Sequence, residues 1–213
     1  MQNTEFRNFS ISVPDAGPGT AAVGISVYAA LHTIIDHVSS SSFAAQPLYS
    51  RFAKELTITD SSASGHAVLS EFATTVDLTV RNTRFSEQDA AAMGLDLGTA
   101  FFDVSDNDFE MSRNVGAYLL YGVHDGSFDG NRLAFVAGSN DVLGAFGLLL
   151  WGVQNVTVSN NYLAGGAGPD STGISVRGIA SEIPMPAVNV SLSGNTFGAG
   201  WVRDYEPGTQ PQR

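Results

Sequence analysis

Apolar and polar residues alternate in short blocks along the chain, and one eight-residue pattern returns several times. In the sequence VTVSNNYL of residues 156–163, apolar residues occupy places one, three and eight, and asparagine occupies place six. Similar patterns occupy residues 78–85, 102–109 and 190–197. Alternation of this kind is the period of a strand with one buried face, and its return indicates strands stacked in successive coils.

The last apolar residue of the pattern, at place eight, gives the length of each coil. It recurs at intervals of 20 to 34 residues, at Phe43, Ala63, Phe85, Phe109, Leu133, Leu163 and Phe197. Place three is apolar in the same repeats, at Val38, Ile58, Val80, Val104, Phe128, Val158 and Leu192. A second strand is predicted where glycine precedes apolar residues, as in residues 24–27, 94–97, 116–119, 147–150 and 173–176. We therefore expect an all-β fold with two or three strands per coil, and one short helix near residues 86–92.

Place six carries asparagine in four repeats and a hydroxyl residue in the three before them. The asparagines are Asn107, Asn131, Asn161 and Asn195, and the hydroxyl residues are Ser41, Ser61 and Thr83. A buried turn leaves backbone groups unpaired, and stacked amides can satisfy both the backbone and one another. With this pattern the chain resembles the right-handed parallel β-helix proteins of the pectate-lyase-like superfamily over residues 6–200. The resemblance implies a single-stranded right-handed parallel β-helix of about 7–9 coils with an internal asparagine ladder.

The coil pattern predicts one domain, residues 1–206, followed by a disordered tail of residues 207–213 that is rich in proline and glutamine. The pattern begins close to the first residue, although the open end of a β-helix needs a cap. We expect either that the chain is part of a longer protein or that a capping partner covers this end.

The charge and hydropathy of the chain exclude some partners. The 213 residues include 21 acidic and 10 basic residues, which gives a net charge of -11. Nucleic-acid binding depends on clustered lysine and arginine, so no nucleic-acid partner is expected. The longest apolar stretch, residues 142–153, contains three glycines and is shorter than the roughly 20 residues of a membrane helix, so no membrane span is expected. The lack of cysteine leaves the compartment open.

Outward-facing places are mostly serine and threonine, but the third to fifth coils carry Asp77, Arg81, Asp103, Asp125 and Asp129. Asp103 and Asp125 lie one coil and two residues apart in the pattern, which puts their Cα atoms roughly 8 Å from each other. This spacing suits the acid and the base of an inverting glycoside hydrolase. That chemistry requires no cofactor, but close carboxylates at Asp77, Asp103 and Asp125 could also hold Ca²⁺. The alternative is that these charges solvate an exposed sheet.

Two histidines lie in short motifs. His124 and Asp125, in YGVHDG, are the best local pair for proton transfer, and they resemble the Asp-Pro-His motif of alginate C5-epimerases without its proline and leading aspartate. Arg81 could position a uronate carboxylate or stabilise the anion formed when a proton is abstracted. His37, at place two in IIDHVS, resembles the Ile-Asp-His strand of several pectate-lyase-like enzymes, and a structural histidine is the alternative.

Three aromatic residues, Tyr118, Tyr121 and Trp151, could stack on sugar rings, with core packing as the alternative. The resemblance covers lyases, glycoside hydrolases, epimerases, phage tailspikes and adhesins, so it implies two hypotheses. The first is a secreted or cell-surface enzyme that acts on a polysaccharide at the acidic outward face, as a lyase, an epimerase or a glycoside hydrolase. The second is a non-catalytic glycan-binding or adhesive module, a segment of a larger surface or spike protein.

Overall fold

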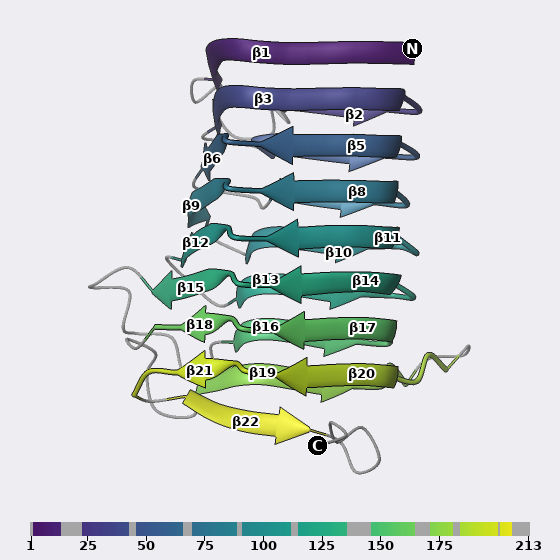
Figure 1. Ribbon diagram of the computed structural model, residues 1–213, viewed down its shortest axis with the longest axis vertical. Coiled ribbons are helices and arrows are strands. Elements are labelled where there is room, and N and C mark those ends of the chain that lie inside the picture. Colours follow the sequence, from purple (N-terminus) through teal and green to yellow (C-terminus); the bar gives the residue numbers. More distant parts are fainter. Residues whose placement is uncertain are drawn as a thin grey trace.

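A computed structural model of the chain describes residues 2–13, 23–42, 46–65, 70–88, 91–111, 115–135, 146–164, 171–180, 184–199 and 201–205. All the regular elements in these stretches are β-strands. They wind into a column of stacked coils, with residues 2–13 at one end and residues 201–205 at the other (Figure 1). The described residues contain no helix long and apolar enough to cross a membrane.

Each coil contributes a strand to three faces of the column. The first face consists of β1 (Gln2–Val13), β3 (Leu31–Ser42), β5 (Lys54–Thr59), β8 (Val76–Arg81), β11 (Ala100–Ser105), β14 (His124–Asp129), β17 (Gln154–Ser159) and β20 (Val188–Ser193). The second face continues from the end of β3 through β6 (Ser62–Gly65), β9 (Arg84–Gln88), β12 (Asp108–Met111), β15 (Arg132–Phe135), β18 (Tyr162–Leu163) and β21 (Thr196–Phe197). The third face consists of β2 (Ile25–Tyr28), β4 (Leu48–Arg51), β7 (Ser70–Ala73), β10 (Ala91–Asp96), β13 (Val115–Leu120), β16 (Phe146–Trp151), β19 (Ser171–Arg177) and β22 (Trp201–Tyr205).

Every strand pairs in parallel with its equivalents in the neighbouring coils. This architecture confirms the prediction of an all-β, right-handed parallel β-helix, and eight strands stack on the first face among the described residues. The second strand that the glycine-led segments predicted belongs to the third face, as in β10, β13 and β16. The coil therefore has three strands.

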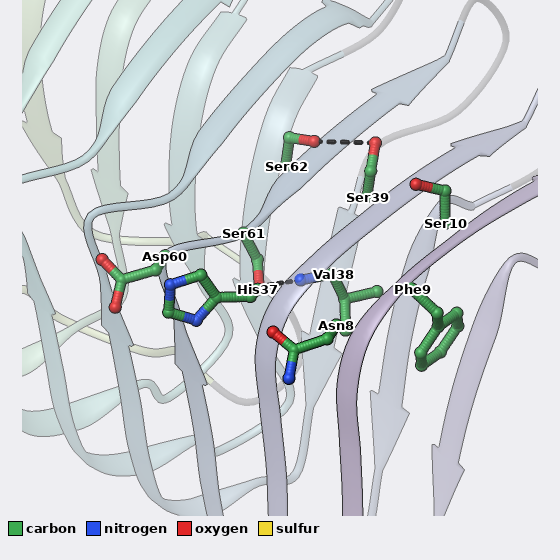
Figure 2. Close-up of a pocket in the computed structure, with 9 residues that line it drawn as sticks. All are labelled: Asn8, Phe9, Ser10, His37, Val38, Ser39, Asp60, Ser61 and Ser62. Atoms are coloured by element: carbon green, nitrogen blue, oxygen red, sulfur yellow. Dashed lines mark hydrogen bonds between the residues drawn. The ribbon is translucent and has the colours of Figure 1, made fainter.

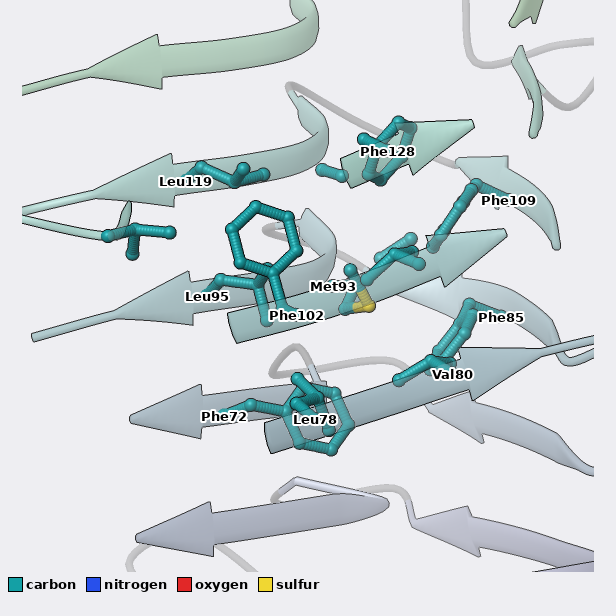
Figure 3. Packing of buried hydrophobic residues seen from close by; sticks show 14 of the residues in the cluster. Phe72, Leu78, Val80, Phe85, Met93, Leu95, Phe102, Phe109, Leu119 and Phe128 are labelled. Carbon is teal, nitrogen blue, oxygen red and sulfur yellow. The ribbon is translucent and has the colours of Figure 1, made fainter. Parts of the chain in front are cut away.

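Two inward rows align from coil to coil as the pattern predicts. Place three aligns Ile58, Val80, Val104, Phe128 and Val158, and place eight aligns Ala63, Phe85, Phe109, Leu133 and Leu163. All of these residues are buried. The rings of Phe85 and Phe109 stack with centroids 5.1 Å apart, and Phe128 stacks on Phe109 at 5.7 Å (Figure 3). A column filled in this way is close-packed and holds its outward side chains on a rigid scaffold.

The asparagines at place six are hydrogen-bonded to one another inside the corner between the first and second faces. Asn131 Nδ2 donates to the backbone oxygen of Val104 at 2.9 Å and to Asn161 Oδ1 at 3.1 Å. Asn131 Oδ1 accepts hydrogen bonds from the backbone N–H and the Nδ2 of Asn107, both at 3.0 Å. The arrangement continues at Asn195, and hydroxyl residues take this place in earlier coils, at Ser61 and Thr83. These side chains satisfy backbone groups that the buried corner leaves unpaired.

The register predicted for the first repeat was wrong by three residues. Ile35, not Val38, aligns with Ile58 at place three, so Val38 takes place six. His37 therefore lies at the corner between the first and second faces rather than at place two. The residue expected at place eight, Phe43, lies outside the described residues. Because β3 runs through the corner as one long strand, periodicity alone did not fix its register.

The short helix expected near residues 86–92 is also wrong for the part of that segment that the structure describes. Residues 84–88 form β9 and residues 91–96 form β10, and each strand pairs with strands of the neighbouring coils. The hydrogen bonds between coils outweigh the helix propensity of the alanine run, because an isolated helix of this length is marginal.

Left-handed backbone, with positive φ, recurs at three places in the coil, one within the first-face strands and two at corners. The row before place one contains His32, Glu55, Asp77, Phe101, Asp125, Asn155 and Asn189. The row between the first and second faces contains His37, Asp60, Asn82, Asp106, Gly130, Asn160 and Gly194. The row between the third and first faces contains Ala29, Phe52, Thr74, Leu97, Tyr121 and Gly152. Glycine, asparagine and aspartate tolerate this conformation best, so the backbone explains many of these residues but not the large apolar ones.

Candidate functional site

The structure divides the sequence-predicted site residues between two faces. The charged residues lie on β8, β11 and β14 of the first face: Asp77, Arg81, Asp103, His124, Asp125 and Asp129. Tyr118 and Trp151 lie on β13 and β16 of the third face, and Tyr121 lies at the corner between these faces. Only Tyr121 is therefore placed beside the predicted acids.

The charges of the first face are paired with one another. Arg81 forms an ion pair with Asp103 in the next coil, and its hydrogen bond to Asp103 raises the pKa of the guanidinium. His124 Nδ1 lies 2.8 Å from Asp125 Oδ2. All four side chains remain between one third and about one half exposed, so a ligand could reach them.

Asp125 is held in its charged form. The hydrogen bond with His124, followed by one from Asn155 Nδ2 at 2.8 Å, lowers the pKa of the Asp125 carboxyl. Asp129 likewise accepts two hydrogen bonds from the next coil. A carboxylate with a lowered pKa accepts hydrogen bonds or protons but is a poor proton donor at neutral pH. The first face thus offers acceptors for hydroxyl groups, and the acid and base roles of Asp103 and Asp125 stay a prediction.

One group of side chains in the first coils has the spacing of metal ligands, and the Ca²⁺ site at Asp77, Asp103 and Asp125 stays a prediction. The ligand atoms of Asp36, His37 and Asp60 all lie within 4.8 Å of one another, and no other group of three His, Asp or Glu residues does so in the described stretches. One imidazole and two carboxylates could hold a divalent cation. Asp36 is already engaged, because its Oδ2 accepts from Arg7 Nη1 at 2.6 Å. The hydrogen bond with His37 is the main cause that lowers the pKa of Asp36, and the hydrogen bond from Thr59 and the charge of Arg7 add smaller effects.

A shallow, open groove of about 380 Å³ adjoins this group. It is lined by Asn8, Phe9, Ser10, His37, Val38, Ser39, Asp60, Ser61 and Ser62, which come from the first three coils. Figure 2 shows His37 and Asp60 next to each other at one side of the groove, with the Phe9 ring at the other. The hydroxyls of Ser39 and Ser62 are hydrogen-bonded to each other at 3.0 Å. Of the candidate residues named from the sequence, His37 lines this groove, and the acids and aromatic residues predicted for the site do not.

Tyr118 covers a glycine on the third face. Glu71, Gly94 and Tyr118 stand in one outward row on three successive strands. The Tyr118 ring lies where a Cβ atom on Gly94 would be, so a larger residue at this position would have to displace the ring. Burial is the main cause that raises the pKa of the Tyr118 phenol, and the charges of Glu71 and Asp96 raise it further.

Glu71 and Asp96 are acids that the sequence pattern did not single out. Burial raises the pKa of both carboxyl groups, and for Glu71 the charge of Asp96 adds to the effect. Gln46 Nε2 donates to Glu71 Oε2 at 2.5 Å. Both acids lie on third-face strands, outside the eight-residue pattern on which the sequence map was built. Their alternation with apolar neighbours such as Phe72 and Leu95 was the available signal.

Neighbouring side chains already contact the indole ring of Trp151. Its Nε1 donates to Ser175 Oγ at 3.1 Å, and the Arg177 guanidinium lies 5.8 Å from the ring centroid. A cation over the ring covers one face of it. Trp151 is therefore less available to a sugar than its place on an outward face suggests.

The corner between the third and first faces is lengthened in two adjacent coils. In three coils the third-face strand is joined to the next first-face strand by two residues, 52–53, 74–75 and 152–153. In the coils of β10 and β13 the connection has three residues, 97–99 and 121–123. In each longer corner a large apolar residue precedes a glycine, and both have positive φ: Leu97 with Gly98, and Tyr121 with Gly122. We call Leu97, Phe101 and Tyr121 the lengthened edge.

The side chains of the lengthened edge point into solvent. Leu97 is 46% exposed, Phe101 is 57% exposed and Tyr121 is 45% exposed. The Phe101 ring meets the His124 ring edge to face, with centroids 6.1 Å apart. The edge therefore lies beside the His124–Asp125 pair. Large apolar residues in left-handed backbone are unfavourable, and such local conflicts are common at functional sites.

Solved structures of low sequence identity share the fold. A double mutant of the periplasmic alginate epimerase AlgG superposes with a TM-score of 0.63 at 11% identity, over 86% of this chain and 46% of the other. The Dettilon tailspike protein gives 0.59 at 13% identity, over 96% and 46%. The full-length tailspike protein 2 from Escherichia coli O157:H7 bacteriophage CAB120 gives 0.53 at 10% identity, over 92% and 30%.

The chain is a parallel β-helix protein. No protein-family model matches its sequence, and no curated protein matches it either. This β-helix spans less than half the length of each of the three solved structures. At these identities the likeness shows the fold alone, so a function has to be argued from the side chains on the column.

Proposed function

We propose that this β-helix binds a polysaccharide at the lengthened edge and acts on it. The observation that carries the proposal is the exposure of Leu97, Phe101 and Tyr121 beside the His124–Asp125 pair. Apolar and aromatic surfaces pack on the C–H faces of sugar rings, while carboxylate and imidazole groups hydrogen-bond to their hydroxyls. A small apolar platform with a few polar groups at its border is the usual composition of a ligand site.

The neighbouring residues of the first face fit the same role. Asp125 and Asp129 are carboxylates in hydrogen-bonding range of the next coil, and the Arg81–Asp103 pair adds a donor and an acceptor one coil away. A glycan that crosses the edge would reach these groups on the acidic outward face. The fold agrees with a polysaccharide ligand, because one protein of the same fold is an alginate epimerase, and alginate is a polysaccharide. A secreted or cell-surface location, as part of a larger chain, would bring the protein to such a substrate.

Substitutions borrowed from other coils test the edge without disturbing the left-handed backbone. The first variant is Phe101→Asn, because Asn155 and Asn189 occupy the same left-handed row in other coils. The second is Tyr121→Gly, because Gly152 stands at the equivalent place in the next coil. We expect each variant to weaken glycan binding about 2- to 10-fold, the effect of losing about 0.5–1.5 kcal/mol of aromatic contact. A glycan array with neutral polysaccharides and polyuronates, with and without Ca²⁺, identifies the ligand, and isothermal titration measures its affinity.

The matched control is Tyr162→Thr on the second face. Tyr162 is 48% exposed, and Thr196 stands at the equivalent place of the next coil. Affinity that falls in Tyr162→Thr as much as in the edge variants, or that stays unchanged in the edge variants, contradicts the proposal. Binding without any change in the glycan would favour the non-catalytic module over the enzyme.

A further inference from the structure

A second group of functional side chains lies on the third face, next to the lengthened edge. Glu71 and Gly94 pair across neighbouring strands, and Asp96 lies two residues beyond Gly94 and directly before Leu97. Glu71 and Asp96 are therefore one coil and two residues apart, with a Cα separation of roughly 8 Å. The group joins the edge because β10 leads straight into the lengthened corner.

Small residues separate these groups from one another. Ala73 stands between Arg51 and Asp96, and Gly94 stands between Glu71 and the base of Tyr118. Among the residues that the structure describes, the Tyr118 ring, which lies over Gly94, is the one bulky group on this part of the row. Arg51 Nε is buried and has no hydrogen-bond partner within the described part of the chain, and the positive charge of its guanidinium lowers the pKa of Glu71. Acceptors, a hydroxyl and a cation thus face one patch of the third face.

The surroundings of Glu71 and Asp96 act differently on the pKa of the two carboxyl groups. Burial raises the pKa of Glu71, and the negative charge of Asp96 raises it again, against the smaller effects of Gln46 and Arg51. Burial also raises the pKa of Asp96, but the carboxylate accepts a hydrogen bond from the backbone N–H of Leu97 at 2.6 Å, which opposes that shift. Of two interacting acids, the one with the stabilised anion ionises first. These surroundings favour Glu71 as the proton donor of the pair and Asp96 as the acceptor.

We propose that Glu71 and Asp96 are the general acid and general base of a glycoside hydrolase site on the third face. Glu71 donates its proton to the glycosidic oxygen as the bond from that oxygen to C1 breaks, and the electron pair of the bond stays on the oxygen. Asp96 accepts a proton from a water molecule whose oxygen forms the new bond to C1. One water is consumed, and attack by this water on the side opposite the departing oxygen inverts C1. The proposal rests on the glycan binding proposed for the edge.

The charges around the patch favour an uncharged glycan. Glu71 and Asp96 lie on it, Asp125 lies across the edge, and the whole chain carries a net charge of -11. The Arg51 guanidinium lies over the Phe52 ring and is a single positive charge among these acids, so a row of uronate carboxylates would meet more repulsion than attraction. Neutral polysaccharides are therefore the expected substrates.

The activity test uses the full chain with fixed panels of neutral polysaccharides and polyuronates, and it measures new reducing ends. We expect cleavage of a neutral glycan, an inverted anomeric centre in the first product by proton NMR, and a fall of about 100-fold or more in Glu71→Gln and Asp96→Asn. The matched controls are Glu110→Gln and Asp108→Asn, whose acids pair with arginines on the second face. Both controls are expected to retain full activity.

The titration of the acids gives a readout that needs no substrate. Carbon NMR of the side-chain carboxyls is expected to show Glu71 titrating above its ordinary range, and Asp96→Asn should lower that pKa. The groups that face Glu71 are Tyr49 and Arg51 from β4, Gln46 before it, Asp96 from β10 and Tyr118 from β13. Turnover should decline as the pH rises through the pKa of Glu71, because the acid then loses its proton.

The outcomes separate the two proposals. Glycan bound at the edge without new reducing ends, or cleavage that survives both Glu71→Gln and Asp96→Asn, overturns the hydrolase site and leaves the binding proposal intact. Ordinary titration of Glu71 overturns its role as the acid whatever the panel shows. If no glycan of either panel binds, the proposed function fails, and the hydrolase site fails with it.

Discussion

At the scale of single residues, backbone conformation accounts for much of the outward sequence. Asp77 and Asp125 drew attention as charged neighbours, yet both occupy the left-handed row in which Asn155 and Asn189 stand at the equivalent places. Aspartate and asparagine are enriched in this conformation, so their presence there needs no catalytic reason. The sequence did not show the φ angles, so the sequence analysis predicted a catalytic or metal-binding role for these aspartates and did not consider their backbone conformation. Phe101, in the same row, has no such backbone explanation.

Gly126 gives a residue-scale prediction about packing. It takes inward place one, where the Phe102 ring of the preceding coil fills the space that a Cβ atom would need. Phe102 is itself buried, so Gly126→Ala is expected to lower the free energy of unfolding by about 1–3 kcal/mol through overpacking. Urea unfolding measures the change. Ser127→Ala, one residue further along β14 and pointing outward, is the control, and an equal loss in both variants would refute the explanation.

At the scale of elements, the eight-residue pattern predicted the first and second faces well because each of its places has one physical task. Apolar places fill the column, and place six satisfies the buried corner. The third face was predicted only as an extra strand, since its outward row changes from Tyr49 to Glu71, Gly94, Tyr118 and Leu149 without a repeated residue type. A periodic signal finds elements that repeat, and it misses a site whose residues differ in every coil.

The place-six row supplies the prediction at this scale. Asn131→Ala would leave the Val104 carbonyl and the Asn107 backbone N–H without their partners inside a buried corner. We expect the free energy of unfolding to fall by about 2–4 kcal/mol, because unsatisfied buried groups cost about 1–3 kcal/mol each. Denaturant unfolding followed by circular dichroism measures it.

The matched control for the corner is Asn160→Gly. Asn160 is an exposed asparagine with a φ of 55°, and Gly130 and Gly194 occupy the same row in other coils. Its substitution removes a surface hydrogen bond to Asp129 and keeps the left-handed backbone. A change within about 0.5 kcal/mol is expected. Equal destabilisation by both substitutions would mean that the buried amide has no special part in the corner.

At the scale of the whole molecule, the column keeps its candidate surfaces apart. The groove at His37 and Asp60 lies in the first three coils, whereas the lengthened edge lies in the coils that contain β10, β11 and β13. The edge is the place where the acidic first face and the Glu71–Asp96 patch of the third face meet. The sequence predicted the fold and some members of each surface, but it could not show that Tyr121 joins the two faces, because that follows from the corner lengths in three dimensions.

The central claim is that glycan is recognised at the lengthened edge, and chemical-shift mapping tests it most directly. Backbone amide shifts of the labelled chain are followed while the oligosaccharide selected on the array is added. We predict that the perturbed amides cluster in residues 94–101 and 118–125, on both sides of the edge. Perturbations centred on the groove around His37 and Asp60, or on the outward residues of the second face, would contradict the account.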